Sequence, residues 1–141
     1  MNTEKLLHAI TQASTVSEAL RFVEDQSTLT PISQLLGDVL ACRQVSPQQL
    51  ATLIDMERST LYRLLNGERL TTRNVLLRIA LALNMNLEET QTLLRSGHRA
   101  ELYALVRRDA LIIFCIERGY SLEKTETELL RKNEASLYER V

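Results

Sequence analysis

Hydrophobic residues recur at helical spacing along most of the chain. In the segment "TEKLLHAITQA" the apolar residues Leu6, Leu7 and Ile10 fall on one face of a helix, and "SEALRFVEDQ" repeats the pattern with Leu20 and Val23. No segment alternates apolar and polar residues strictly enough to indicate a strand. The pattern therefore predicts an all-α protein.

Capping signals indicate where several helices begin. Thr30-Pro31 is expected to open a helix that runs to about Arg43, with threonine as the cap and proline at the first helical position. The run Ser46-Pro47-Gln48-Gln49 repeats this device, and its last glutamine is placed to complete a capping box with the serine. A short helix to Ile54 should follow.

The later helices are bounded by similar signals. Asn66-Gly67 is typical of a helix end, so the helix that begins at Arg58 is expected to stop there. Asn86 and Ser121 are each placed to cap a helix that follows them. The remaining helices are expected at about residues 73–83, 87–95, 108–118 and 122–132.

One stretch of the second half of the chain occurs twice. "NLEETQTLLRSGHRAELY" from Asn86 matches "SLEKTETELLRKNEASLY" from Ser121, 35 residues later, with a one-residue slip at the double leucine. The match reaches back to Arg73 with Arg108, and predicts two copies of a helical hairpin, too few for a solenoid. The second copy is interpreted as an extension of the first copy's core. A dimerisation or partner surface is the alternative.

Two of the predicted helices, residues 46–54 and 58–65, are joined by only three residues. So short a connection makes the helices cross steeply, and Ala51 allows the second helix to approach the first. Met56, Leu61 and Leu64 would then pack the second helix against its partner. The free face of this helix carries Arg58, Ser59, Thr60, Tyr62, Arg63 and Asn66.

The residue types on this free face are those that hold and read DNA. Arginine offers paired donors to guanine, serine and threonine hydroxyls suit phosphates or base edges, and asparagine pairs with adenine or phosphate. The helix start at residues 46–49 lies beside this face, and helix N-termini favour phosphates. Tyr62 is open to two interpretations, stacking on the sugar-phosphate chain or shielding the core.

Net charge changes this picture only locally. The formal charge of -1 and the pI of about 6.1 give no overall attraction to polyanions. Fourteen of the 17 basic residues are arginine, which suits planar, bidentate recognition better than lysine does. Between positions 47 and 83 the sequence has five arginines and three acidic residues, whereas acidic residues outnumber basic ones before position 46. The basic residues are therefore expected to concentrate at the predicted DNA-binding face.

These features resemble the Xre/Cro/phage-repressor type of helix-turn-helix DNA-binding domain. The resemblance covers about residues 32–95 and includes the progression "QQLATLIDMERSTLYRLLNGER" followed by "LLRIALALNMNLEE". It implies a five-helix core in which residues 46–54 form the positioning helix and residues 58–65 the recognition helix. Two positions depart from the family pattern. Asp55 replaces the frequent glycine of the turn, and Pro47 replaces a glutamine that binds phosphate in many members.

The resemblance implies a set of DNA contacts. Arg58 and Arg63 would discriminate bases, and Gly67 would approach the backbone with the residue before it. Because Pro47 lacks a donor, Gln48, Gln49 or the hydroxyl of Ser46 would have to supply the phosphate contact. The full set of expected DNA-binding residues is Ser46, Gln48, Gln49, Arg58, Ser59, Thr60, Tyr62, Arg63, Asn66 and Arg69.

The sequence thus predicts a transcriptional regulator that binds double-stranded DNA sequence-specifically. Three parts are expected: an N-terminal helical extension (1–28), the helix-turn-helix domain (29–97) and a C-terminal hairpin (98–141). A homodimer on two half-sites about one helical turn apart is expected. The hairpin or the N-terminal helices would supply its contact, and the hairpin is also a candidate surface for a protein partner. The alternative is a protein-interaction adaptor or antitoxin-like protein on the same fold.

Other functions find no support in the sequence. There is no phosphate-binding glycine loop, catalytic serine motif or metal-ligand spacing, so neither an enzyme nor a cofactor or metal site is expected. Cys42 and Cys115 are interpreted as two buried, reduced thiols. The apolar run "ALIIFCI" is too short to span a bilayer. A cytoplasmic protein without a membrane contact is expected. Arg107-Arg108-Asp109 is interpreted as a helix start with its charge partner.

Overall fold

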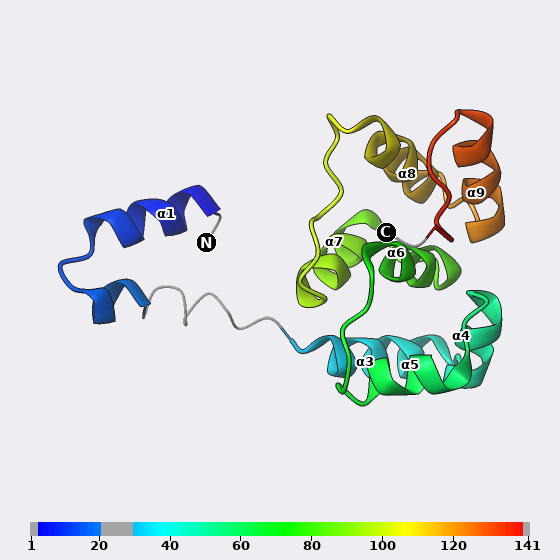
Figure 1. The fold of residues 1–141 in the computed structure, drawn as a ribbon, viewed down its shortest axis with the longest axis horizontal. Helices are drawn as coiled ribbons and strands as arrows, with labels where there is room; N and C mark the ends of the chain where they lie inside the picture. The colour runs from blue at the N-terminus through cyan, green and yellow to red at the C-terminus, as the bar shows by residue number, and fades with distance from the viewer. Residues whose placement is uncertain (1–2, 21–29, 140–141) are drawn as a thin grey trace. The chain divides into compact units, whose positions relative to one another are not determined.

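The structure is a computed structural model that describes residues 3–20 and 30–139. The chain divides into two compact units, Met1–Thr30 and Pro31–Val141. All regular structure among the described residues is helical, which confirms the predicted all-α fold (Figure 1).

The first unit contains α1, Thr3–Gln12, and a further helical stretch at residues 16–20. Leu6 and Ile10 are partly buried in this unit, whereas Leu7 is mainly exposed. The second helix expected here is described only in its first part, because Val23 lies outside the described residues.

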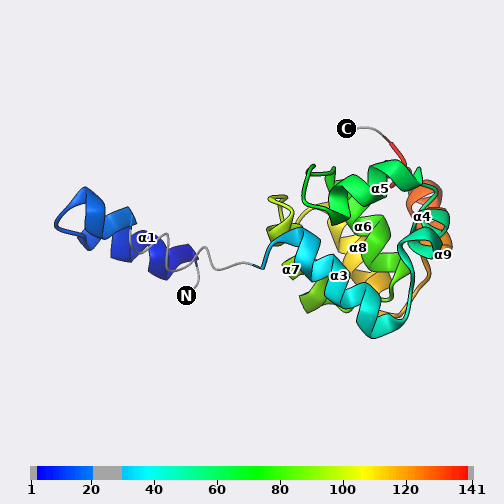
Figure 2. The ribbon, with the colours of Figure 1, turned by 90° about the horizontal axis from the view of Figure 1, so that it is seen from below.

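The second unit is built from paired short helices. α3–α5 lie on one side of α6, and α8 lies on the other (Figures 1 and 2). The contacts between helices join α3 to α5 and α7, α4 to α5 and α6, α7 to α6 and α8, and α9 to α6 and α8. The helices are α3 (Ile32–Arg43), α4 (Pro47–Leu53), α5 (Arg58–Leu65), α6 (Arg73–Ala82), α7 (Leu87–Ser96), α8 (Arg107–Glu117) and α9 (Leu122–Arg131).

Helix caps were the most reliable local signals. Ser46 and Gln49 form the predicted capping box, and Asn86 and Ser121 cap α7 and α9 as expected. The prediction for α3 was wrong by one residue. The N-cap is Pro31 itself, without a side-chain hydrogen bond, so the proline lies outside the helix that it was expected to start.

A single core of leucine and isoleucine runs through α3 to α9. Leu36, Leu61, Leu93 and Leu129 are each completely buried. Gly97, at the end of α7, is needed for this packing, because a Cβ there would lie 2.5 Å from Leu76 Cδ1. The helices α3 to α7 and the C-terminal hairpin therefore share one hydrophobic interior.

The turn between α4 and α5 uses a left-handed residue. Asp55 has a φ of 53°, and the Met56 N–H donates to the Ala51 carbonyl at 2.9 Å. Ala51 is 2% exposed, so the two helices approach closely at this point, as predicted. Aspartate tolerates this conformation better than most residues, which explains how it replaces glycine here.

The repeated hairpin is present as two equal structures. α7 and α9 both contain ten residues, and they keep the 35-residue offset along their whole length. The slip in the sequence match therefore has no counterpart in the structure. Residues with positive φ also match, since Asn84 corresponds to Gly119 and His98 to Asn133.

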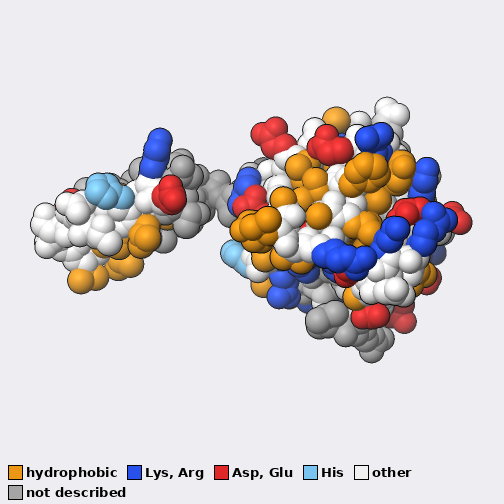
Figure 3. Space-filling view, turned by 90° about the horizontal axis from the view of Figure 1, so that it is seen from above, with side chains coloured by type: hydrophobic (Ala, Val, Ile, Leu, Met, Phe, Trp, Pro, Cys, Tyr) orange, Lys and Arg blue, Asp and Glu red, His pale blue; other side chains and the backbone are white. Residues whose placement is uncertain are grey.

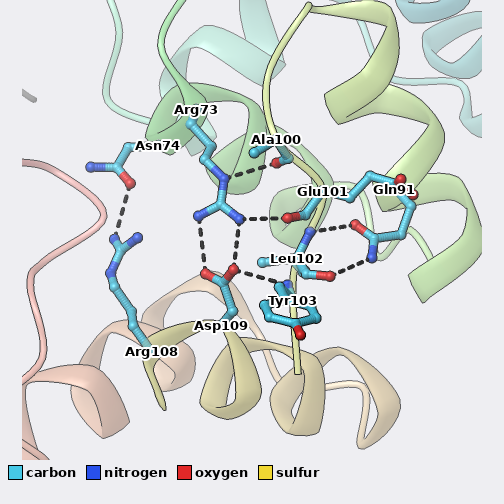
Figure 4. A network of polar contacts seen from close by, with 9 residues as sticks. All are labelled: Arg73, Asn74, Gln91, Ala100, Glu101, Leu102, Tyr103, Arg108 and Asp109. Atoms are coloured by element: carbon cyan, nitrogen blue, oxygen red, sulfur yellow. Dashed lines mark hydrogen bonds and ion pairs between the residues drawn. The ribbon is translucent and has the colours of Figure 1, made fainter. Parts of the chain in front are cut away.

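In each copy a helical side chain holds the segment that follows the hairpin. In the first copy, Gln91 accepts from the Leu102 N–H at 2.7 Å and donates to its carbonyl at 2.9 Å (Figure 4). In the second, Glu126 accepts from the Leu137 N–H at 3.1 Å. Both leucines are buried, so these hydrogen bonds seat the two segments on the core.

Two arginines join the copies reciprocally. Arg73 donates to both carboxylate oxygens of Asp109, at 3.0 and 2.8 Å, and to the carbonyls of Ala100 and Glu101 (Figure 4). Arg108, which corresponds to Arg73, donates to Asn74 Oδ1 at 3.0 Å and to two carbonyls of the second segment. Since Asn74 corresponds to Asp109, each arginine reaches across to the other copy.

The two hairpins are thus related by an approximate two-fold axis within one chain. α6 contacts α9, and α8 contacts α7 in the corresponding way. A solenoid would instead repeat one direction of contact from copy to copy. The interpretation of the second copy as an extension of the core of the first agrees with this packing.

The two thiols lie in different environments. Cys115 is buried as predicted, and burial raises the pKa of its thiol, so it stays protonated at neutral pH. The prediction for Cys42 was wrong, because it lies on an exposed side of α3. Neighbouring hydrophobic residues in the sequence did not reveal which side of the helix it occupies.

Arg73→Ala should destabilise the second unit by about 3 kcal/mol, because the Asp109 carboxylate would stay buried without its partner. Urea unfolding at neutral pH measures this change in the free energy of unfolding. Arg95→Ala is the matched control, since its ion pair with Glu101 is exposed, and it should cost about 0.5 kcal/mol or less.

The destabilisation by Arg73→Ala should also depend on pH. Burial alone would raise the pKa of Asp109, but hydrogen bonds from Arg73 and the Tyr103 N–H, with the charges of Arg73 and Arg108, hold it below its ordinary value. The stabilisation is therefore present above about pH 4 and is lost as the pH falls through the folded-state pKa. A difference between wild type and variant that is independent of pH would contradict this assignment.

Asp55→Gly should stabilise the protein by about 0.5 kcal/mol, because glycine adopts a positive φ without steric penalty. Asp55→Asn separates the backbone effect from the charge, since asparagine also tolerates this conformation. Thermal unfolding of the three proteins should place the glycine variant highest, with the asparagine variant close to wild type. An equal gain in both variants would attribute the effect to charge.

Candidate nucleic-acid interface

At the capped start of α4, two polar side chains already form hydrogen bonds with the backbone of the same helix start. Ser46 Oγ accepts from the Gln49 N–H at 3.1 Å, and Gln49 Oε1 accepts from the Ser46 N–H at 2.8 Å. Gln48 lies between them, exposed, and within the described part of the chain its side chain has no hydrogen-bond partner. Of the three residues expected to replace the missing glutamine, Gln48 is therefore the most available.

α5 is held from one side only. Leu61 and Leu64 are 0% and 2% exposed, and Met56 packs against the same core. The helix has the predicted bounds and ends as expected, with Gly67 at a φ of 76° and the Glu68 N–H bonded to the Arg63 carbonyl. A short, rigid helix with its opposite side free is the result.

The predicted contact residues fall mainly on that free side. Tyr62 is 43% exposed, so it does not shield the core. Thr60 is half-buried and borders a hollow that Leu137, Tyr138 and Glu139 also line. The position of the C-terminal segment beside this hollow was not predicted from the sequence. The exposed members of the predicted set are Ser46, Gln48, Gln49, Arg58, Ser59, Tyr62, Arg63, Asn66 and Arg69.

The arginines of the protein divide into two groups. Arg58, Arg63 and Arg69 make no hydrogen bond, ion pair or ring contact with any residue that the structure describes. Every other arginine in the described ranges has such a partner, including Arg118, which stacks on the Phe114 ring. These partnered arginines are Arg43, Arg73, Arg78, Arg95, Arg99, Arg107, Arg108, Arg118 and Arg131.

The expected basic excess is therefore not found at this face. Arg73 binds Asp109, and Arg78 is 9% exposed, stacked on Tyr138 and bonded to the Leu137 carbonyl. The three remaining arginines lie close in sequence to three exposed acidic residues, Asp55, Glu57 and Glu68. The free cations at α5 are thus specific side chains rather than part of a broad positive field.

Other kinds of site are not formed by the described residues. None of the described helices has the length and apolar character that crossing a bilayer requires. Within the same ranges no group of histidine, cysteine and acidic residues has the arrangement of a metal site.

Comparison with known proteins assigns the helix-turn-helix segment. Residues 36–90 match the family of Cro/C1-type HTH DNA-binding domains. No curated protein and no solved structure gives a significant match to the chain. The matched segment begins within α3 and ends within α7, so it contains α4, α5 and α6 entirely. The predicted resemblance is confirmed over residues 36–90, which are similar to Cro/C1-type HTH DNA-binding domains.

Proposed function

We propose that this protein is a transcriptional regulator that places α5 in the major groove of double-stranded DNA and reads its sequence there. The observation that carries the proposal is the state of Arg58, Arg63 and Arg69, which are the unpartnered arginines of the described ranges. An unpaired guanidinium on a fixed helix meets a guanine edge or a phosphate without breaking a bond within the protein.

The packing of α5 supports base recognition by its arginines. Ser59, Arg63 and Asn66 are three or four residues apart and lie opposite the buried Leu61 and Leu64. Arg58 and Arg63 are separated by five residues, or about 7.5 Å along the helix, which corresponds to about two base pairs. Each can therefore contact a different base pair.

The backbone contacts follow from the same geometry. Gln48 is the proposed phosphate contact of α4, while Ser46 and Gln49 hold the turn that presents it. Asn66 and Arg69 are exposed at the end of α5 and are proposed to hold the adjacent phosphates. The homodimer, a protein partner for the C-terminal hairpin and a cytoplasmic location stay predictions from the sequence.

One observation favours a second candidate function. The exposed Asp55, Glu57 and Glu68 stand close in sequence to the three free arginines, so the charge there is nearly balanced. Balanced charge suits a complementary protein surface as well as DNA. A protein-interaction adaptor or antitoxin-like protein that lacks specific DNA contacts is therefore the alternative.

Selection of binding sites from random duplex DNA should recover an enriched motif at physiological salt. Specific binding retains affinity there because base contacts add to the phosphate contacts, whereas binding to phosphates alone weakens steeply with salt. The measurement is the enrichment of sequences over a series of salt concentrations. Recovery of no motif, with only weak binding that disappears by physiological salt, would favour the protein-binding alternative.

Arg63→Ala should reduce affinity for the selected site by about 1 to 3 kcal/mol and relax base preference at one position. Gln48→Ala should instead weaken binding to all sequences alike, because a phosphate contact carries no sequence information. Arg118→Ala is the control, an exposed arginine on the far side of α6. A uniform loss over all sequences for Arg63→Ala would reassign that residue to the phosphates.

A further inference from the structure

One side of α8 carries a stripe of partly exposed residues, in which the Phe114 ring contacts Arg118 and Tyr120 from the end of the same hairpin helix and its turn. Ala110 and Phe114 lie at its centre, and Arg107 and Glu117 lie at its two ends. These residues are three or four positions apart and lie opposite the fully buried Ile112, so they share one face of the helix. Figure 3 views this side and shows hydrophobic side chains gathered beside lysine and arginine.

The repeat shows that the equivalent stripe of α6 is covered by other helices. Val75 and Ile79 correspond to Ala110 and Phe114, and Ile79 is 0% exposed whereas Phe114 is 50% exposed. The two hairpins contact each other in the same way, so their mutual packing does not explain this difference. α6 also contacts α4, and this contact has no counterpart at α8 among the helix contacts of the described residues. The free face of α8 is thus the counterpart of a face that packs on helices.

The stripe on α8 is complementary to itself when two copies of the helix run antiparallel. A two-fold axis at the level of Ile112 places the large ring of Phe114 in one protein chain over the small side chain of Ala110 in the other chain. The same axis places Arg107 of each protein chain beside Glu117 of the other chain, so the interface contains this pair twice. In this one register of the two helices, each large side chain lies against a small one, and each positive side chain lies beside a negative one.

The charged ends of the stripe are accessible for such pairing. Within the described ranges Glu117 has no hydrogen bond or ion pair. Arg107 bonds the Lys132 carbonyl and Glu134, yet its side chain is 68% exposed, so further donors remain for a second acceptor.

We propose that two copies of this chain associate through antiparallel α8 helices, with Phe114 on Ala110 and Arg107 beside Glu117 across the interface. α8 and α5 lie on opposite sides of α6 (Figure 1). Such a pair carries its two recognition helices on its outer sides, so it holds two separate DNA segments rather than neighbouring half-sites of one. The association does not depend on DNA binding, whereas the joining of two DNA segments rests on the proposed function.

Sedimentation velocity of the full chain over a series of concentrations tests the interface. The wild type should form a dimer that dissociates on dilution, and Phe114→Glu should sediment as a monomer at every concentration. Leu53→Glu is the matched control, because Leu53 on α4 is exposed to a similar extent, 53% against 50%. A monomeric wild type, or a Phe114→Glu variant that still dimerises, would overturn the proposal and leave this face to another protein.

A charge exchange tests the register of the two helices. Glu117→Arg should raise the dissociation constant of the dimer about tenfold or more, because it places two arginines side by side. The double variant Arg107→Glu/Glu117→Arg should restore the dimer, since the pair re-forms with its signs exchanged. Failure of the double variant to recover, with its helical circular dichroism intact, would exclude this register.

A bridging assay separates this proposal from the proposed function. One duplex carrying the selected site is immobilised, and a second, labelled duplex is added with the protein. The wild type should retain the labelled duplex, whereas Phe114→Glu should bind each duplex but retain no label. A protein that dimerises through α8 yet binds no DNA would refute the proposed function and leave the interface in place.

Discussion

The ion pair between Arg73 and Asp109 connects the first hairpin of the second unit, which begins with α6, to the second hairpin, which begins with α8. The guanidinium lies at the start of α6, binds a buried carboxylate at the start of α8, and donates hydrogen bonds to the carbonyls of Ala100 and Glu101, which lie between these helices in the sequence. A carboxylate that is 4% exposed is tolerable only with such a partner. α6 also contacts α4, which packs on α5, so the position of α5 depends on the same attachment.

Burial separates the structural arginines from those available to a ligand. Arg73, Arg78 and Arg108 contact carbonyls, a carboxylate, an amide oxygen or an aromatic ring inside the unit. Arg58 and Arg63 lie on α5 and have no partner among the residues that the structure describes. Arginine is frequent along the chain, and the side of the helix on which each arginine lies determines whether it has a structural role or is available to a ligand.

Local signals predicted the helices and the exposed side of α5 well, because capping and turn formation involve neighbouring residues. The bounds of α5, the capping box at Ser46 and the left-handed turn at Asp55 all follow from a few adjacent positions. Features set by distant contacts were not predictable in this way. The buried role of Arg78 depends on Leu137 and Tyr138, and the exposure of Cys42 depends on which side of α3 faces the core.

The repeat was predictable from the sequence only in part. Its existence was readable from matched letters, but the reciprocal use of Arg73 and Arg108 appears only when the two copies are placed face to face. Each hairpin supplies part of the other's anchoring, so neither copy is a module that can be lost or exchanged alone. Substitutions in one copy are therefore constrained by the other, and the duplicated halves of this chain have to evolve together.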